Sequence, residues 1–81
     1  MFKVRKWSDS NSRPYDVVYV DDIRNNIHYQ PGVEFSTIEG AYKHKEVLIK
    51  STDEDSIEFI RNHWPTDGAA DEDNSEEPKI D

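Results

Sequence analysis

The alternation of apolar and polar residues predicts short strands in the first half of the chain. Residues 2–7 alternate in part, with Phe2 and Val4 on one face and two cations on the other, which is typical of a half-exposed strand. A polar stretch at residues 8–14 then predicts a loop. Residues 15–20 form the strongest predicted strand, and because this strand is apolar on both faces we expect it to be covered on both sides.

A second pair of short strands is predicted around the sequence Gln30-Pro31-Gly32-Val33. Proline presets φ at the second position of a type II turn, and glycine tolerates a positive φ at the third. The flanking residues 27–29 and 33–35 alternate as strands do. Because a type II turn matches the twist of a hairpin poorly, we expect loose or bulged pairing between these two strands.

Residues 36–50 fit either a helix or a strand. A capping box begins at Ser36, and apolar residues at helical spacing follow it. Gly40 disfavours a helix, however, and the apolar run at residues 47–49 is typical of a buried strand. We therefore expect a turn near Gly40 and a strand over residues 42–50, with a helix as the alternative.

The signals for a helix are stronger after residue 50. Ser51 or Thr52 is a candidate N-cap, and three acids follow in the first turn, where the helix dipole favours negative charge. Apolar residues at i, i+3 and i+7, counted from Ile57, form one face of this helix. We expect Pro65 to end it.

The predicted fold is therefore α+β: a small antiparallel sheet of three to four strands with one C-terminal helix. We assign residues 1–66 to this domain and residues 67–81 to a disordered acidic tail. The chain has a net charge of −8, and residues 67–81 hold seven acids against one base, whereas residues 1–66 are nearly balanced. A block of like charge without aromatic residues buries too little apolar surface to become ordered.

Size and composition limit how such a domain is stabilised. A chain of 81 residues without cysteine has no disulfides to support a small core, so its nine aromatic residues must supply the bulk. Small size and the two-faced strand at residues 15–20 favour a homodimer. The lack of cysteine fits a reducing compartment, and no apolar run suits a signal peptide or a membrane span. We therefore expect a cytoplasmic location and no membrane partner.

No residue pattern predicts catalysis, a cofactor or a metal site. The three histidines, His28, His44 and His63, lack the spacing of metal ligands, and we expect them at surface or helix-end positions. The serines lie in predicted caps and loops, and a body of this size has little room for a cleft that would desolvate paired carboxylates. We therefore expect a protein that is not an enzyme, with no catalytic residues, no metal and no cofactor.

Cations and an aromatic ring are interleaved near the N-terminus, at Lys3, Arg5 and Trp7. This combination suits single-stranded nucleic acid, in which bases stack on aromatic rings and cations follow the phosphates. The alternative is an edge strand whose charges prevent aggregation. Because the net charge is −8, we expect no direct binding of nucleic acid.

The acids are the main candidates for function. Carboxylates at i and i+2 of a strand lie about 6.6–6.8 Å apart, which is of the same order as the separation of successive phosphates. An acidic surface with an anionic arm therefore suits a groove that normally holds DNA or RNA, and its charge speeds the encounter. The alternative is that the acids only cap a helix and keep the chain in solution. The predicted partner-binding residues are Asp21, Asp22, Asp53, Glu54, Asp55, Glu58, Asp71, Glu72, Asp73, Glu76 and Glu77.

Together these patterns predict a non-enzymatic acidic binding protein of the DNA-mimic type, an inhibitor that occupies the basic nucleic-acid-binding surface of a partner protein. A nucleoid protein, a polymerase or a nuclease has such a surface. The alternative is a small accessory or regulatory module that docks on a larger assembly, such as RNA polymerase, through a sheet edge and aromatic residues. In size and composition the chain resembles the short proteins with which bacteriophages block host factors. This resemblance does not rest on any motif.

Overall fold

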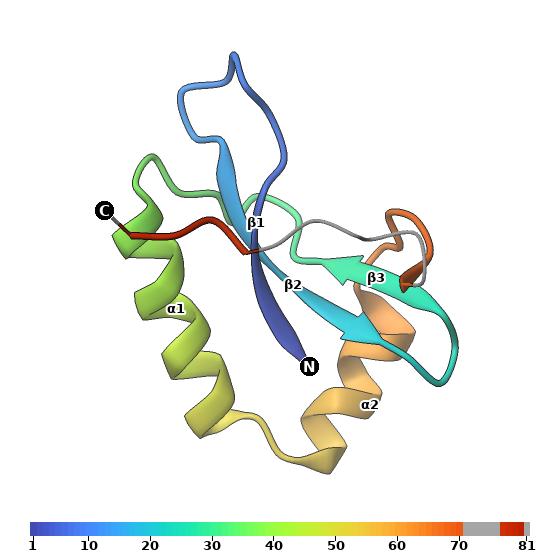
Figure 1. The fold of residues 1–81 in the computed structure, drawn as a ribbon. Helices are drawn as coiled ribbons and strands as arrows, with labels where there is room; N and C mark the ends of the chain where they lie inside the picture. Colours follow the sequence, from blue (N-terminus) through green and yellow to red (C-terminus); the bar gives the residue numbers. More distant parts are fainter. Residues whose placement is uncertain (71–76, 81) are drawn as a thin grey trace.

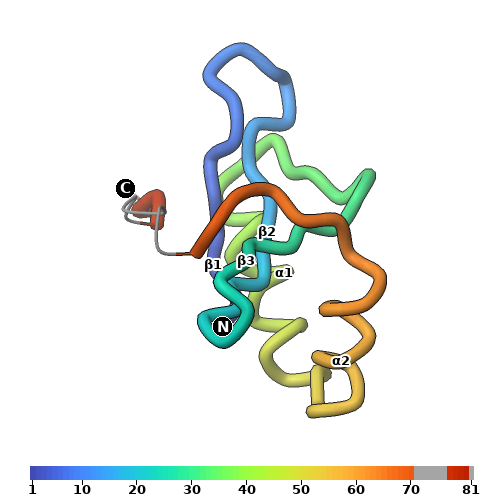
Figure 2. The backbone as a smooth tube through the Cα atoms, turned by 90° about the vertical axis from the view of Figure 1, so that its right-hand side faces the viewer, coloured from blue at the N-terminus to red at the C-terminus, as the bar shows by residue number. Residues whose placement is uncertain are grey.

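The chain folds into a small α+β structure, in which a three-stranded antiparallel sheet is followed by two helices. The structure is a computed structural model that describes residues 1–70 and 77–80. The elements are β1 (Phe2–Lys6), β2 (Tyr15–Asp21), β3 (Asn26–Tyr29), α1 (Ile38–Ser51) and α2 (Glu54–His63), and the strands lie in the order β1-β2-β3. In Figure 1 and Figure 2 the loop between β1 and β2 and the turn between α1 and α2 lie at opposite ends of the molecule.

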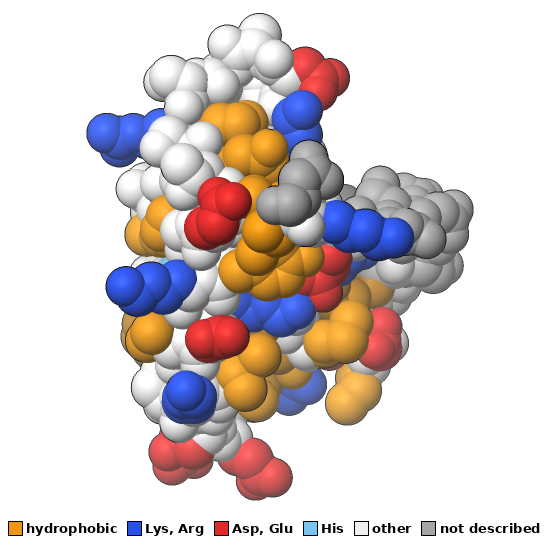
Figure 3. All heavy atoms as spheres, turned by 60° about the vertical axis from the view of Figure 1, so that its left-hand side comes forward, with side chains coloured by type: hydrophobic (Ala, Val, Ile, Leu, Met, Phe, Trp, Pro, Cys, Tyr) orange, Lys and Arg blue, Asp and Glu red, His pale blue; other side chains and the backbone are white. Residues whose placement is uncertain are grey.

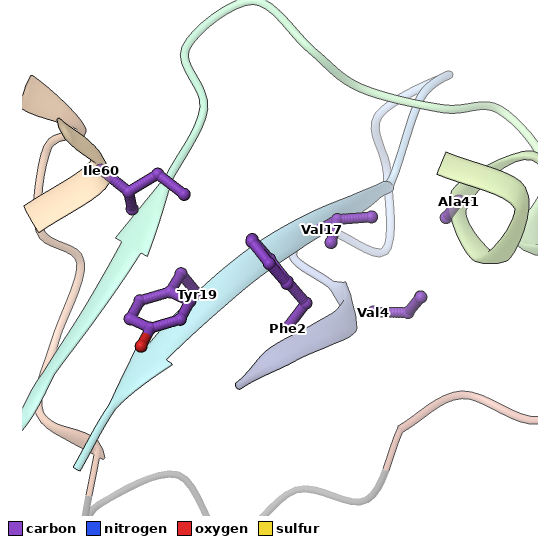
Figure 4. Packing of buried hydrophobic residues seen from close by; sticks show 6 residues of the cluster. All are labelled: Phe2, Val4, Val17, Tyr19, Ala41 and Ile60. Carbon is purple, nitrogen blue, oxygen red and sulfur yellow. The ribbon is translucent and has the colours of Figure 1, made fainter. Parts of the chain in front are cut away.

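The register of the sheet gathers the main core on one of its faces. β1 pairs antiparallel with β2, and Val4 lies directly opposite Val17. Side chains of such a pair point to the same face of a sheet. Figure 4 shows the buried side chains of this face between Ala41 of α1 and Ile60 of α2. Both helices therefore cover the same side of the sheet.

The opposite face of the sheet carries a smaller apolar cluster. Val18 and Val20 of β2 and Ile27 of β3 are buried there, and Tyr29 and Ala70 pack against them. The strong strand expected at residues 15–20 is thus confirmed as the central strand β2, with apolar residues buried on both of its faces. On the second face, part of the cover comes from the segment that follows α2.

The prediction of a strand over residues 42–50 is wrong, because α1 runs from Ile38 to Ser51. Thr37, rather than Ser36, is the N-cap of this helix, and its side-chain oxygen accepts a hydrogen bond from the backbone N–H of Gly40 at 3.1 Å. A Cβ atom at Gly40 would lie only 3.1 Å from the same oxygen. The glycine that disfavours a helix by its propensity therefore allows the close approach of this cap.

The apolar run at residues 47–49 misled the sequence interpretation for a different reason. Leu48 packs against the core, whereas the side chains of Val47 and Ile49 are 54% and 56% exposed. In a helix, neighbouring residues point in different directions, so only one of three consecutive apolar residues needs to face the sheet. A buried strand and a helix with two exposed apolar neighbours have the same local pattern.

The predicted C-terminal helix is confirmed as α2, although its N-cap is Asp53 and not Ser51 or Thr52. The Asp53 carboxylate accepts a hydrogen bond from the backbone N–H of Ser56 at 2.9 Å. The helix ends at His63, just before the expected stop at Pro65. The described residues thus form two helices where one was predicted, and three strands, within the predicted range of three to four.

The turn after β3 is confirmed, but the hairpin around it is not. The backbone N–H of Val33 donates to the carbonyl of Gln30 at 3.3 Å, and Gly32 has a φ of 77°, as a type II turn requires at its third position. Instead of returning along β3, the chain continues to Phe35, which forms an isolated antiparallel bridge with Tyr15 of β2. The predicted second strand at residues 33–35 is therefore reduced to one bridge.

Parts of the segment predicted to be a disordered tail contact the domain. The backbone of residues 67–70 runs beside β3, where Asp67 donates to Ile27 at 2.7 Å and Gly68 accepts from Ile27 at 3.0 Å. Farther along, Glu77 forms an ion pair with Lys45 of α1. The expected boundary at residue 66 therefore cuts through a bonded segment, whereas residues 71–76 and 81 lie outside the described residues.

Both helices are short. α1 has 14 residues and α2 has ten, whereas a helix needs about 20 mostly apolar residues to cross a bilayer. Accordingly, the described ranges 1–70 and 77–80 contain no helix with the length and apolar character of a membrane span. The cytoplasmic location stays a prediction.

Candidate acidic interface

Exposed acids gather at the end of the molecule where α2 begins. Asp53 caps the helix, Glu54 and Asp55 lie in its first turn, and Glu58 follows one turn later. Glu54, Asp55 and Glu58 line a shallow hollow of about 460 Å³. Tyr19, Ile57 and Arg61 line the same hollow. Figure 3 shows acidic side chains projecting at this end of the molecule. We group these residues with Asp22, an exposed acid of the β2–β3 turn, and call the set the acidic rim: Asp22, Asp53, Glu54, Asp55 and Glu58.

The rim has a local structural cause that does not depend on any partner. The first turn of a helix leaves backbone N–H groups without partners, and negative charge is stabilised there. At Asp53, the hydrogen bond from the backbone N–H of Ser56 lowers the pKa of the carboxyl group. The cap is therefore ionised at neutral pH, and it supports α2 whether or not the rim binds anything.

Asp21, which the sequence places with Asp22 in one acidic pair, has a different environment. Its side chain is 1% exposed, and it accepts a hydrogen bond from Nε of Arg61 at 3.0 Å. It also accepts from the backbone N–H groups of Ile23 and Arg24, at 3.2 and 3.3 Å. Burial alone would raise the pKa of Asp21, but the Arg24 N–H and the Arg61 guanidinium hold it below the usual value.

Asp21 therefore joins the β2–β3 turn to α2 and does not present its carboxylate to a partner. Asp22, the next residue, is exposed, and its charge acts on the partly buried amino group of Met1. Burial lowers the pKa of that amino group, while the charges of Asp22 and Asp21 act to raise it. Glu58 lies 4.0 Å from Arg24 of the same turn, so the β2–β3 turn and α2 meet along this side of the rim.

Glu77 is the predicted tail acid that the structure places. Its carboxylate accepts hydrogen bonds from Nζ of Lys45 at 2.8 and 2.9 Å and from the backbone N–H of Val4 at 3.3 Å. Burial raises the pKa of Glu77, but the Lys45 ammonium and the Val4 N–H outweigh this and lower it. Glu77 thus contacts its own chain, and four predicted binding residues lie outside the described part: Asp71, Glu72, Asp73 and Glu76.

The sequence did not predict a partly buried ion-pair network on the second face of the sheet. Arg5 donates to both carboxylate oxygens of Asp16, from Nε at 3.1 Å and from Nη2 at 2.8 Å. Its Nη1 donates to Asp67 at 2.7 Å. Arg5, one of the cations that suit single-stranded nucleic acid, is therefore bound by acids of its own chain. The signal was the cross-strand pair of Arg5 and Asp16, visible only once the register is known.

The expectation for the histidines is wrong for His28, which is 2% exposed on β3. Its Nδ1 lies 3.1 Å from the carbonyl oxygen of Trp64, so the ring links β3 to the end of α2. His63 lies in the last turn of α2 and stacks on Phe59, with ring centroids 4.3 Å apart. Within the described residues, no three histidine or acidic side chains converge as metal ligands do.

The outer edge of β1 and the adjacent side of α1 form a second candidate surface. β1 is an edge strand, and the N–H of Val4 on this edge binds the Glu77 carboxylate. Beside it, a groove of about 400 Å³ is lined by apolar residues that include Met1, Ile49 and Ile57, and also by the ion pair of Lys45 and Glu77. Figure 3 shows hydrophobic side chains exposed between charged ones on the α1 side.

Comparison with known proteins gives no match among family models, curated proteins or solved structures.

Proposed function

We propose that this protein is a non-enzymatic acidic binding protein that occupies the basic nucleic-acid-binding surface of a partner protein. A nucleoid protein, a polymerase or a nuclease offers a surface of this kind. The observation that supports the proposal is the acidic rim, in which Glu54, Asp55 and Glu58 surround one hollow. Among the described residues, neither Glu54 nor Asp55 forms an ion pair, so both remain available to cations of a partner.

The spacing of the rim acids suits this role. Glu54 and Glu58 stand at i and i+4 of α2, where Cβ atoms lie about 5–6 Å apart on one helix face. This spacing is comparable with that of successive phosphates, and it is set by a helix rather than by a strand. Carboxylates held on a helix lose less conformational entropy on docking than those of a flexible arm.

The rest of the molecule supports a protein partner rather than nucleic acid. The net charge of −8 repels a phosphate backbone. Arg5, one of the cations suited to phosphates, is already bound by Asp16 and Asp67. We therefore keep the proposal that the protein itself does not bind nucleic acid.

The experiment that tests the proposal compares two charge-reversed variants. In the rim variant, Glu54, Asp55 and Glu58 become lysine. In the matched control, three exposed acids away from the rim, Asp9, Glu39 and Glu46, become lysine. Both changes alter the net charge equally, and both include a first-turn acid of a helix, Glu39 in α1 and Glu54 and Asp55 in α2. Circular dichroism first establishes that each variant is folded.

The measurement is capture of a DNA-binding protein from a bacterial lysate on the immobilised protein, followed by competition with DNA. We expect the wild type and the control to release DNA from the captured partner, and the rim variant to fail. Binding should also weaken steeply between about 50 and 500 mM salt, because screening shortens the range of the charges. Equal release by all three proteins, or an affinity that does not change with salt, contradicts the proposal.

The second candidate is an accessory module that docks on a larger assembly, such as RNA polymerase, through the edge of β1 and nearby aromatic residues. It is favoured by the exposed apolar groove beside β1 and by Trp7, which is 39% exposed. Strand addition and apolar contact tolerate salt, so binding that is insensitive to salt favours this module over the acidic mimic.

The homodimer remains a proposal with less support than the sequence suggested. It was inferred because one short helix cannot cover two faces of a strand. In the structure, Val18 and Val20 on the second face of β2 are buried within a single chain. Sedimentation velocity across micromolar concentrations distinguishes a dimer from a 9.5 kDa monomer.

A further inference from the structure

A pocket of about 270 Å³ lies at the end of the sheet where β1 leads into the loop before β2. Arg5, Asp16 and Tyr29 line it from the sheet face opposite the helices, and the turn after β3 and Asp67 close its sides. No residue of the acidic rim lines this pocket. Its volume is just below the usual range of ligand pockets, about 300–1,000 Å³, which suits a single side chain better than a nucleotide or a cofactor.

The floor of the pocket is not available to an anion. The Arg5 guanidinium already donates from Nε, Nη1 and Nη2 to carboxylates of Asp16 and Asp67. The positive charge of Arg5 thus faces the negative charges of Asp16 and Asp67, and Glu34 adds a further negative charge. The pocket therefore has an excess of negative charge, and an added cation is favoured there.

The walls of the pocket provide what an organic cation needs. Trp7 and Tyr29 both line it, and aromatic rings attract ammonium and guanidinium groups. Glu34 also lines it, is partly buried, and forms no hydrogen bond or ion pair within the described residues. Each of the other two acids of the pocket already binds Arg5, so Glu34 holds the carboxylate that lacks a cation.

We propose that this pocket binds a lysine or arginine side chain of a partner protein, between Trp7 and Tyr29 and next to Glu34. The side chain supplies an alkyl stem for the aromatic walls and a cation for the carboxylate. This site goes beyond the proposed role of the acidic rim, because it lies on other elements and recognises one side chain rather than a charged surface.

The test uses small probes whose binding is followed by NMR of the ¹⁵N-labelled protein at constant ionic strength. The probes are the N-acetyl N-methylamides of lysine and arginine, with the norleucine compound as an uncharged control of similar length. The reporters are the indole N–H of Trp7, assigned with a Trp7→Phe variant, and the backbone N–H groups of Gly32 and Val33. We expect saturable shifts at these positions with the two cationic probes only.

Variants of the full chain then assign the binding to the pocket. Glu34→Gln should weaken the lysine probe about two- to fivefold, as expected for a partly exposed ion pair, and Trp7→Ala should weaken it by a similar factor. Glu46→Gln, which removes a matched exposed charge on α1, should have no effect. The rim variant should keep its affinity for the probe, so failure of the rim proposal leaves this site standing.

Three results would overturn the inference. The first is equal shifts with the norleucine probe, which would reduce the pocket to an apolar contact. The second is an equal loss of affinity in Glu34→Gln and Glu46→Gln, or a loss in the rim variant, which would show a general negative field. The third is the absence of saturable shifts at Trp7, Gly32 and Val33.

Discussion

Two acidic regions of this protein have opposite properties. In the first region, Asp21 and Asp16 are nearly inaccessible to water and each binds an arginine of another element, Arg61 and Arg5 respectively. In the second region, the acidic rim, the carboxylates are exposed, and all except that of Asp22 belong to the N-cap and the first two turns of α2. Asp21 and Asp22 are neighbours in the chain, yet one belongs to each region.

The difference shows that negative charge serves two purposes here. A buried carboxylate is stable only when a cation and hydrogen-bond donors compensate for its lost hydration. Asp21 has both, from Arg61 and from the backbone of the β2–β3 turn. The exposed rim acids meet no such demand, and apart from Asp53, which caps α2, their surface charges contribute little to stability. Stability should therefore depend on the first region and partner binding on the second.

The largest expected effect comes from Asp21→Ala. The change removes the Arg61 ion pair and leaves two backbone N–H groups of the turn without their acceptor. Breaking a buried pair costs several kcal/mol, and because Arg61 keeps some contact with water we expect a loss of about 2–3 kcal/mol in the free energy of unfolding. Urea denaturation measures it. The control, Asp22→Ala, should change stability by less than about 0.5 kcal/mol, and equal losses would erase the distinction between the two regions.

The segment after α2 should rank next. Truncation after Pro65 removes the hydrogen bonds of residues 67–70 to β3, the packing of Ala70 and the Asp67 carboxylate bound to Arg5. At about 0.5–1.5 kcal/mol for each hydrogen bond, we expect a total loss of about 2 kcal/mol by thermal or urea unfolding. Truncation after Ala70 keeps these contacts and, among the described residues, removes only those of residues 77–80, so its loss should be the smaller of the two. Identical stability of both truncated chains would show that residues 66–70 contribute nothing.

Acid should weaken the contact between Asp21 and Arg61 less than Asp21→Ala does, because a protonated carboxyl group still accepts hydrogen bonds. The folded state holds the pKa of Asp21 below its usual value, which is about 3.9 in an unfolded chain. Its stabilising contribution is therefore fully present above pH 4, on the order of that unfolded value, and is lost as pH falls through the lower folded pKa. The urea concentration at the midpoint of unfolding should decrease as pH falls below about 4. In Asp21→Asn this decrease should be smaller. A midpoint that rises on acidification would contradict the assignment.

The smallest effect is expected for Glu77, which lies between the two regions in exposure. Its side chain is 29% exposed and that of Lys45 is 19% exposed. Glu77→Gln keeps the shape but removes the charge, so we expect a loss of about 0.5–1 kcal/mol in the free energy of unfolding. High salt should reduce the difference between the variant and the wild type. The same loss in Glu46→Gln would show that the effect is not specific to this ion pair.

The candidate sites differ in how far the sequence predicted them. The acids at the start of α2 follow from a local rule, because a helix N-terminus favours them, and the sequence located them correctly apart from the position of the cap. The Lys3, Arg5 and Trp7 pattern, by contrast, fitted either single-stranded nucleic acid or an edge strand protected by charge, and the net charge of −8 argued against nucleic acid. Arg5 instead binds Asp16 and Asp67, and this pairing depends on strand register and on a segment more than 60 positions later in the chain.

The sequence by itself determined β1, β2, β3, the type II turn at Gly32 and helix α2, because each follows from alternation, a turn dipeptide or a helix stop within a few residues. Tertiary structure decided α1, where an apolar run fits two conformations and the sheet face selects the helix that covers it. It also decided that Asp21 is buried beside Arg61 while Asp22 is exposed. Burial and ion pairing depend on residues far apart in the chain, so no local pattern distinguishes two adjacent aspartates.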